Sequence, residues 1–193
     1  MAHEAFFADL RTKTPALFLE NYLFDRVPSL FQDDRSLYVT WKRELAKRVD
    51  VDPACVMLVG TAATGVSLNP IKGFKHFDEQ SDVDVAVISS YHFNEAWRFL
   101  RLNGARRLTV DPRTKNAWDE HVKKYIYWGT IATDRLLGIL PFGLKWLKAI
   151  SELALMKPTE GRDINLRIYA DFDSLRFYQT NSVRAARESI GSN

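Results

Sequence analysis

The stretch "LVGTAATGVSLNPIKGFKHFDEQSDVDVAVIS", residues 58–89, contains the features that decide the fold. An apolar run ends at Gly60-Thr61, a long polar segment follows, and Asp82 and Asp84 stand at the head of a second apolar run. Successive side chains of a strand point to opposite faces, so both aspartates share one face and the valines between and after them share the other. The pattern predicts two buried strands, with a pair of carboxylates where the second begins.

The rest of the chain predicts a mixed α/β fold, a small sheet flanked by helices. Short apolar runs at 54–60 and 83–89 predict buried strands, and strict alternation at 164–172 predicts a half-exposed strand. Apolar spacing and capping signals predict helices at 3–32 with a break at Thr14-Pro15, 33–49, 91–105, 114–128, 133–140, 142–156 and 173–190. We expect one domain over residues 1–193, made of an N-terminal helical segment (1–35), a core with the motifs (36–100), a second helical segment (101–160) and the last strand and helix (161–193).

Composition and charge are those of an ordinary globular protein. The formal net charge is +3 and the sequence pI about 9.0, which permits a phosphate-bearing partner without requiring one. The single cysteine, Cys55, excludes a disulfide within the chain and fits a reducing cytoplasm. No apolar stretch reaches the ~18 residues of a membrane span, and the N-terminal segment lacks the apolar core of a secretory signal. We therefore expect a cytoplasmic protein without a membrane partner.

The aspartate pair predicts a cation site. Asp82 and Asp84 carry like charges on one face of the expected strand, so they repel one another unless a cation lies between them. Carboxylate oxygens are hard ligands that suit Mg²⁺ or Mn²⁺. A cation held there could also bind a triphosphate and neutralise charge on its phosphoryl oxygens. The alternative is a pair of solvated acids at the entry of a strand.

Gly60 and the threonines after it supply the other half of the predicted site. A glycine after a buried strand lets the backbone approach a ligand closely. If "TAATG" at 61–65 begins a short helix, the free N–H groups of its first turn favour phosphate. The hydroxyls of Thr61 and Thr64 can donate to phosphate oxygens. The sequence therefore predicts that Gly60, Thr61 and Thr64 bind the phosphates of a nucleotide, beside a metal held by the aspartates.

This pattern resembles the polymerase-β-like nucleotidyltransferase superfamily, which includes minimal nucleotidyltransferases, aminoglycoside nucleotidyltransferases, and enzymes similar to oligoadenylate and cyclic-dinucleotide synthases. The matching residues, within about residues 36–100, are Gly60-Thr61, Thr64-Gly65 and Asp82-Val83-Asp84. The resemblance implies a sheet of nucleotidyltransferase type, binding of ATP or another nucleoside triphosphate, and two Mg²⁺ ions at the aspartates. Small stand-alone members often act in toxin–antitoxin or phage-defence systems, so the resemblance also implies an antiviral-defence setting.

The loop between the two motifs is longer than is usual in this family. Residues 69–80 look like an insertion, and they carry Lys72, Lys75 and His76. These side chains either contact phosphate or are simply solvated. The second position of the family's Gly-Ser motif is a threonine here, which keeps the hydroxyl.

The third carboxylate of the family has no clear counterpart. In the family it lies on a later strand, completes the metal site and acts as general base. The polar face of the expected strand at 164–172 is bordered by Asp163 and Asp171, and Arg167 stands at its centre. We predict that Asp163 is the third ligand and base. Asp171, or no third acid at all, are the alternatives.

Two functions follow as hypotheses. The first is a metal-dependent nucleotidyltransferase that moves a nucleoside monophosphate to a protein, an RNA, a small molecule or another nucleotide, with Asp82, Asp84 and Asp163 as catalytic residues. The second is a catalytically degenerate member of the fold that binds a nucleotide or nucleic acid, or serves as a partner subunit. The central Arg167 favours the second. A third acid within about 4–6 Å of the aspartate pair, close enough to share a cation, would favour the first.

Overall fold

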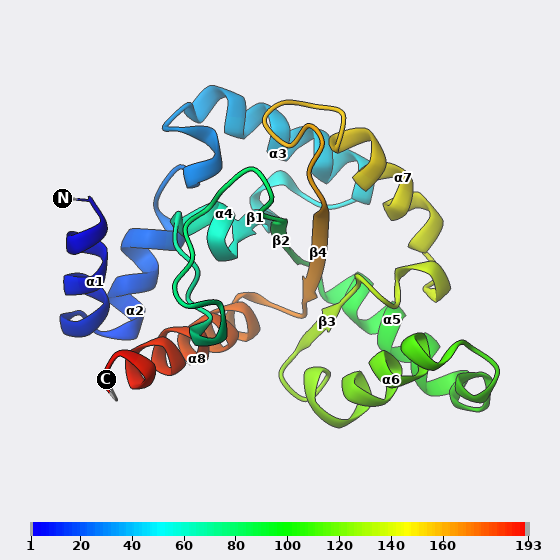
Figure 1. Cartoon of the computed structure of the whole chain (residues 1–193). Coiled ribbons are helices and arrows are strands. Elements are labelled where there is room, and N and C mark those ends of the chain that lie inside the picture. Colours follow the sequence, from blue (N-terminus) through cyan, green and yellow to red (C-terminus); the bar gives the residue numbers. More distant parts are fainter. Residues whose placement is uncertain (1, 192–193) are drawn as a thin grey trace.

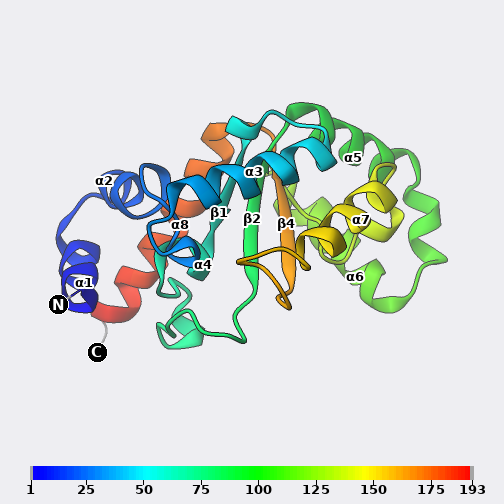
Figure 2. The same cartoon turned by 90° about the horizontal axis from the view of Figure 1, so that it is seen from above.

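The computed structural model describes residues 2–191 and confirms the mixed α/β class (Figures 1 and 2). Its elements are α1 (Ala2–Thr12), α2 (Pro15–Leu19), α3 (Arg35–Val49), β1 (Val56–Val59), α4 (Gly60–Thr64), β2 (Val83–Ile88), α5 (Ser90–Leu102), α6 (Pro112–Glu120), β3 (Thr130–Ala132), α7 (Gly143–Leu153), β4 (Ile164–Tyr169) and α8 (Phe172–Gly191). Single π-helical turns extend α2 over Glu20–Phe24 and α6 over His121–Tyr125. The break expected at Thr14-Pro15 is present, because the Thr14 side chain caps α2 by accepting from the Leu17 N–H.

The four strands form one sheet in the order β1-β2-β4-β3. β1 is antiparallel to β2, β2 is parallel to β4, and β3 is antiparallel to β4 at the edge. A parallel pair requires a long crossover, which here contains α5, α6, β3 and α7. β2 and β4 therefore lie in the middle of the sheet, and β2 has a strand on each side.

One face of the sheet is apolar throughout. Val83, Val85 and Val87 of β2 are fully buried, and they alternate with the residues that point to the other face. Figure 1 shows α3 and α7 on one side of the sheet and α8 on the other. The Trp41 indole of α3 donates a hydrogen bond of 3.0 Å to the Thr159 hydroxyl, which ties α3 to the loop that leads into β4.

The two ends of the chain pack together. α1 and α2 lie beside α8 at one end of the molecule, while α5 and α6 lie at the other (Figures 1 and 2). Arg187 of α8 donates hydrogen bonds to the carbonyls of Leu10 and Lys13, at and just beyond the end of α1. The N-terminal helices thus share the hydrophobic core of the rest of the molecule. Within the described chain, every helix is too short or too polar to traverse a lipid bilayer.

Two predicted helices differ from the structure. The N-terminal helical segment, expected to reach residue 32, ends at Phe24, and only a 3₁₀ turn at Ser29–Phe31 follows it. The segment 133–140 was expected to be a helix, but only Leu137–Ile139 forms a 3₁₀ turn, and β3 immediately precedes it. β3 is three residues long and is held by β4 on one side. On its other side the backbone N–H of Ala132 donates to Nε2 of His121, at 3.0 Å. These tertiary partners stabilise the short strand, and its own sequence contains no pattern that predicts it.

Candidate active site

Asp82 and Asp84 lie where the sequence places them. Asp84 is the second residue of β2 and stands in register between Val59 of β1 and Asn165 of β4. Asp82 directly precedes the strand, and Val83 between them is fully buried. Both aspartates therefore belong to the face of the sheet opposite the valines, and both are exposed to solvent.

Gly60 lies against one of these carboxylates. It begins α4 directly after β1, with φ +62°, and a Cβ added to it would lie 2.9 Å from Oδ2 of Asp84. Glycine adopts this left-handed conformation without strain, and its missing Cβ leaves room for the carboxylate. In the described structure no side chain caps the N terminus of α4, so its first-turn N–H groups are left for solvent or a ligand. The predicted short helix is present, and the strand-to-helix turn brings Gly60 and Thr61 beside Asp84.

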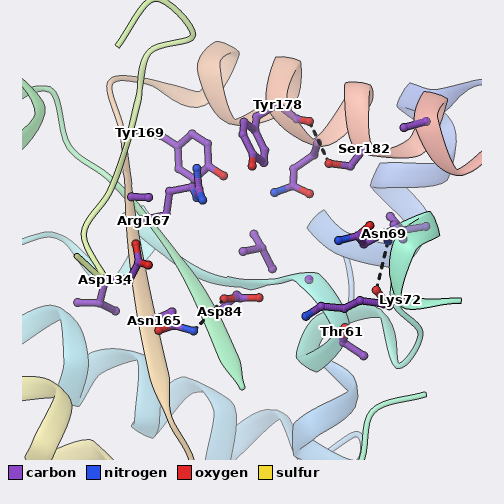
Figure 3. A pocket seen from close by; sticks show the side chains of 18 of the residues that line it. Thr61, Asn69, Lys72, Asp84, Asp134, Asn165, Arg167, Tyr169, Tyr178 and Ser182 are labelled. Atoms are coloured by element: carbon purple, nitrogen blue, oxygen red, sulfur yellow. Dashed lines mark hydrogen bonds between the residues drawn. The ribbon is translucent and has the colours of Figure 1, made fainter. Parts of the chain in front are cut away.

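A cavity of about 440 Å³ opens along this face of the sheet, under α8 and the loop at 67–72 (Figure 3). One end is lined by Gly60, Thr61, Asp84, Asn165 and Lys72, and the other by Arg167, Tyr169, Tyr178 and Gln179. A smaller cavity of about 90 Å³ adjoins it, shares Thr61, Lys72 and Asp84, and adds Asp82, Lys75 and His76. The larger volume is typical of small-molecule sites.

The electrostatic environment of Asp84 suits a cation. Its side chain reaches solvent at the cavity, but the surrounding protein atoms partly desolvate the carboxylate, and this is the main cause that raises its pKa; the charge of Asp82 raises it further. The amide of Asn165, 3.5 Å from Oδ1 of Asp84, and the charges of Arg167 and Lys72 act in the opposite direction. Figure 3 shows Lys72 extending towards Asp84. The carboxylate is thus incompletely compensated, and a bound cation would relieve the remaining cost.

The residue beside Asp84 on β4 carries an amide side chain instead of a carboxylate. Asn165 is in register with Asp84, where an acid would complete a three-carboxylate site. In residues 2–191 no group of three or more His, Cys, Asp or Glu side chains is arranged to hold a metal ion. A hard cation at this site would therefore take its ligands from the aspartate pair, from substrate oxygens and from water.

The two acids considered for the third position lie outside the cavities. Asp163 is exposed and precedes β4, and its backbone carbonyl accepts from the N–H of Val83 at 2.8 Å. Asp171 follows β4, and its carboxylate accepts from the N–H of Ser174 at 2.7 Å, where it closes the first turn of α8. Neither residue lines either cavity.

Thr64 also lies away from the cavity. Its side chain is 7% exposed, and its hydroxyl contacts the carbonyls of Val66 at 2.7 Å and Gly60 at 3.1 Å. Thr61 lines both cavities instead. Of the two threonines predicted to bind phosphate, Thr61 is therefore the one that a ligand in the cavity would meet.

The structure adds Asp134 to the cavity. The N–H of Thr133 donates to the carbonyl of Leu166 at 3.1 Å, so Asp134 follows β3 on the side of β4 opposite Asp84. Its carboxylate and that of Asp84 thus flank Asn165 (Figure 3). Sequence reasoning missed Asp134 because its segment was predicted to be helical.

Comparison with known proteins returned nothing: neither the scan against protein-family models nor the searches of curated proteins and of solved structures found a match for this chain.

Proposed function

We propose that the protein is a metal-dependent nucleotidyltransferase, which moves a nucleoside monophosphate from a nucleoside triphosphate to an acceptor hydroxyl. The observation that supports this most is the close approach of Gly60 to Asp84, which leaves no room for a Cβ, at the wall of a cavity of about 440 Å³. Gly60, the uncapped start of α4 and Asp84 lie at one wall of this cavity, and Asp82 lines the smaller cavity that adjoins it. Two carboxylates on one face have the ligand type and charge that Mg²⁺ or Mn²⁺ requires.

In this proposal each group at the Asp84 end has a role. Asp82 and Asp84 hold the cation, which when bound neutralises charge on the phosphoryl oxygens. The first-turn N–H groups of α4, the Thr61 hydroxyl and the Lys72 ammonium bind the triphosphate. The acceptor oxygen forms a bond to the α-phosphorus, the bond to the bridging oxygen breaks, and pyrophosphate leaves.

The proton of the acceptor hydroxyl needs a base within reach. Asp163, the base predicted from sequence, lines neither cavity, whereas Asp134 lines the larger one. We therefore assign the general base to Asp134 in preference to Asp163. An Asp134→Asn variant would then keep nucleotide affinity and lose turnover by about 10²–10⁴-fold, the usual worth of general base catalysis. An Asp163→Asn variant is the matched comparison, and the opposite ranking of the two would contradict this assignment.

A second candidate function is favoured by Asn165. An amide beside Asp84 is a weaker metal ligand than the acid of a three-carboxylate site, and Arg167 brings a positive charge into the same cavity. The alternative is thus a catalytically degenerate nucleotidyltransferase fold that binds a nucleotide or nucleic acid, or serves as a partner subunit.

Calorimetric titration of each nucleoside triphosphate, with and without Mg²⁺, tests both candidates. We expect Mg²⁺-dependent binding in the wild type and a loss of at least about tenfold in Asp82→Asn/Asp84→Asn, because the charged ligands are removed. Asp173→Asn, which removes an exposed acid outside the cavities, is the control. Affinity that ignores both metal and aspartates would overturn the proposal. Mg²⁺-dependent binding without label transfer from an α-labelled nucleotide to any acceptor would favour the degenerate module.

A further inference from the structure

The end of the cavity away from Asp84 contains a half-buried arginine, Arg167, that has no ion-pair partner among the described residues. Arg167 lies 5.3 Å from the ring centre of Tyr125 and 4.8 Å from that of Tyr178. Its Nη1 is buried and has no hydrogen-bond partner within the described structure. None of the ion pairs found in residues 2–191 includes Arg167.

A second polar group at this end is also unpartnered. Tyr169, two residues along the same face of β4, is fully buried, and its hydroxyl has no hydrogen-bond partner in the described chain. Gln179 of α8 is close enough to favour ionisation of this hydroxyl, but without the geometry of a hydrogen bond. Burial raises the pKa of Tyr169 well above its ordinary value, so the hydroxyl keeps its proton and can donate. Both residues line the cavity (Figure 3).

Burial of these groups without partners is costly in the free protein. A guanidinium N–H group removed from water loses its hydration unless an anion or a hydrogen bond replaces it. The tyrosine rings offset part of this loss through their faces. They do not use the N–H groups at the edge of the guanidinium, and this edge is the part that binds an oxyanion in bidentate geometry.

We propose that Arg167 and Tyr169 form an anion subsite that binds a phosphate group without a metal. Arg167 supplies only donors, the unpartnered Tyr169 hydroxyl can donate its proton, and the rings of Tyr125 and Tyr178 hold the guanidinium in place. On the proposed function, the phosphate belongs to the accepting substrate, a second nucleotide. The assignment of the phosphate to an accepting nucleotide rests on the proposed nucleotidyltransferase function, whereas the anion subsite itself does not.

The place of this subsite fits an acceptor. Arg167 is the next residue after Asn165 on the same face of β4, and its charge lowers the pKa of Asp84. A phosphate at Arg167 would thus hold a second nucleotide in the same cavity as the first, on the side of the sheet where Asp134 lies.

Metal-free titrations with inorganic phosphate and with nucleoside monophosphates, in buffer with a chelator, test the subsite. We expect wild-type binding at millimolar concentration or below, a loss of about tenfold in Arg167→Lys, which keeps the charge but not the fork, and a smaller loss in Tyr169→Phe. Arg176→Met is the matched control, because Arg176 also lies over a ring, that of Phe24, but is ion-paired with Glu20 and outside the cavity.

Folding of the variants is checked by thermal unfolding. Tyr169→Phe removes a buried unpartnered hydroxyl, so it should leave the Tm unchanged or higher and still reduce the rise in Tm that phosphate produces. Equal phosphate affinity in the wild type, Arg167→Lys and Tyr169→Phe would overturn the subsite, as would equal losses in Arg176→Met. Binding of inorganic phosphate but of no monophosphate would overturn the assignment to an accepting nucleotide.

The two proposals fail separately. Asp82→Asn/Asp84→Asn should lose Mg²⁺-dependent triphosphate binding and keep metal-free phosphate binding, since Arg167 and Tyr169 are intact. Arg167→Lys should lose metal-free phosphate binding and keep Mg²⁺-dependent triphosphate binding. A protein that binds phosphate at Arg167 and never binds Mg²⁺–triphosphate would retain the subsite and lose the proposed transferase function.

Discussion

Asp84 is central to both the geometry and the electrostatics of the candidate site. Its carboxylate occupies the space that a Cβ at Gly60 would need, lies 3.5 Å from the amide of Asn165, and lines the cavity. Burial and the charge of Asp82 raise its pKa from the ordinary 3.8. A proton and a metal cation both relieve this cost, so they compete for the same oxygens.

The raised pKa of Asp84 predicts a pH-dependent effect of Asp84→Asn. The folded state binds a proton at Asp84 more tightly than the unfolded state, so the free energy of unfolding falls as pH rises from 3.8 through the raised value. At pH 7 the ionised, partly desolvated carboxylate of Asp84 destabilises the wild type, whereas the asparagine variant carries no charge at this position. We expect the variant to gain up to ~1 kcal/mol, reduced here for solvent screening, or about 2–4 °C in Tm.

Thermal unfolding of both proteins at pH 7 and pH 3, without divalent metal, measures this difference. The gain should shrink or vanish at pH 3, where the wild-type carboxyl is protonated. An equal gain at both pH values would attribute the effect to hydrogen bonding instead of charge. Added Mg²⁺ should raise the Tm of the wild type alone if the aspartates hold a cation.

At the scale of elements, the junction of β1 and α4 positions the site. The chain leaves β1 at Val59, turns at Gly60 with φ +62°, and enters a helix of five residues. This turn brings backbone N–H groups towards the carboxylates at the start of the neighbouring antiparallel strand. The geometry depends on the absence of a Cβ at Gly60.

Gly60→Ala should therefore destabilise the protein more than a matched substitution. Both Gly60 and Gly73 have positive φ, +62° and +58°, but an added Cβ meets Oδ2 of Asp84 at Gly60 and no atom within 4 Å at Gly73. Each alanine costs about 1–2 kcal/mol for its left-handed backbone. We expect Gly60→Ala to cost at least ~1 kcal/mol more and to weaken triphosphate binding.

Urea unfolding of the two variants and of Gly60→Ala/Asp84→Ala gives the comparison. Removal of the Asp84 carboxylate should recover the extra loss, since the contact is then gone. Equal losses in the free energy of unfolding for Gly60→Ala and Gly73→Ala would show that the close approach of Gly60 to Asp84 does not add to the destabilisation.

At the scale of the whole molecule, the N-terminal helices belong to the common core. Phe6 and Leu10 of α1 are buried, and Arg187 of α8 hydrogen-bonds the carbonyls at the end of α1. The core is continuous from these helices through the sheet to α7. A continuous core favours a single cooperative unfolding transition, although the chain has helices at both ends.

Leu10→Ala tests this continuity. Leu10 is fully buried, so the substitution should cost about 2–5 kcal/mol. Leu17 of α2 is 49% exposed, so Leu17→Ala should change the free energy of unfolding by no more than about 0.5 kcal/mol. Urea unfolding followed by fluorescence and by circular dichroism should give one transition that shifts as a whole. An early, separate transition in Leu10→Ala would show that the N-terminal helices unfold independently.

Local patterns in the sequence were sufficient to predict the class of fold, the order of most elements, and the positions of Asp82, Asp84 and Gly60 in the candidate site. These features depend on local rules: side chains alternate along a strand, glycine alone tolerates the turn after β1, and Thr14 before Pro15 starts a helix. The strands at β1, β2 and β4 lie within the predicted segments. The roles of Thr61 and the aspartates in binding stay predictions.

The residues that lie beside Asp84 could not be predicted from the sequence, because long-range packing brings them there. Register between β2 and β4, which are far apart in the chain, places Asn165 next to it and leaves Asp163 outside the cavity. The three-residue β3 brings Asp134 to the far side of Asn165. The packing of α8 against the sheet places the ring of Tyr178 over the guanidinium of Arg167. Strand register and helix docking are set by the packing of the whole core, and no short-range pattern in the sequence encodes them.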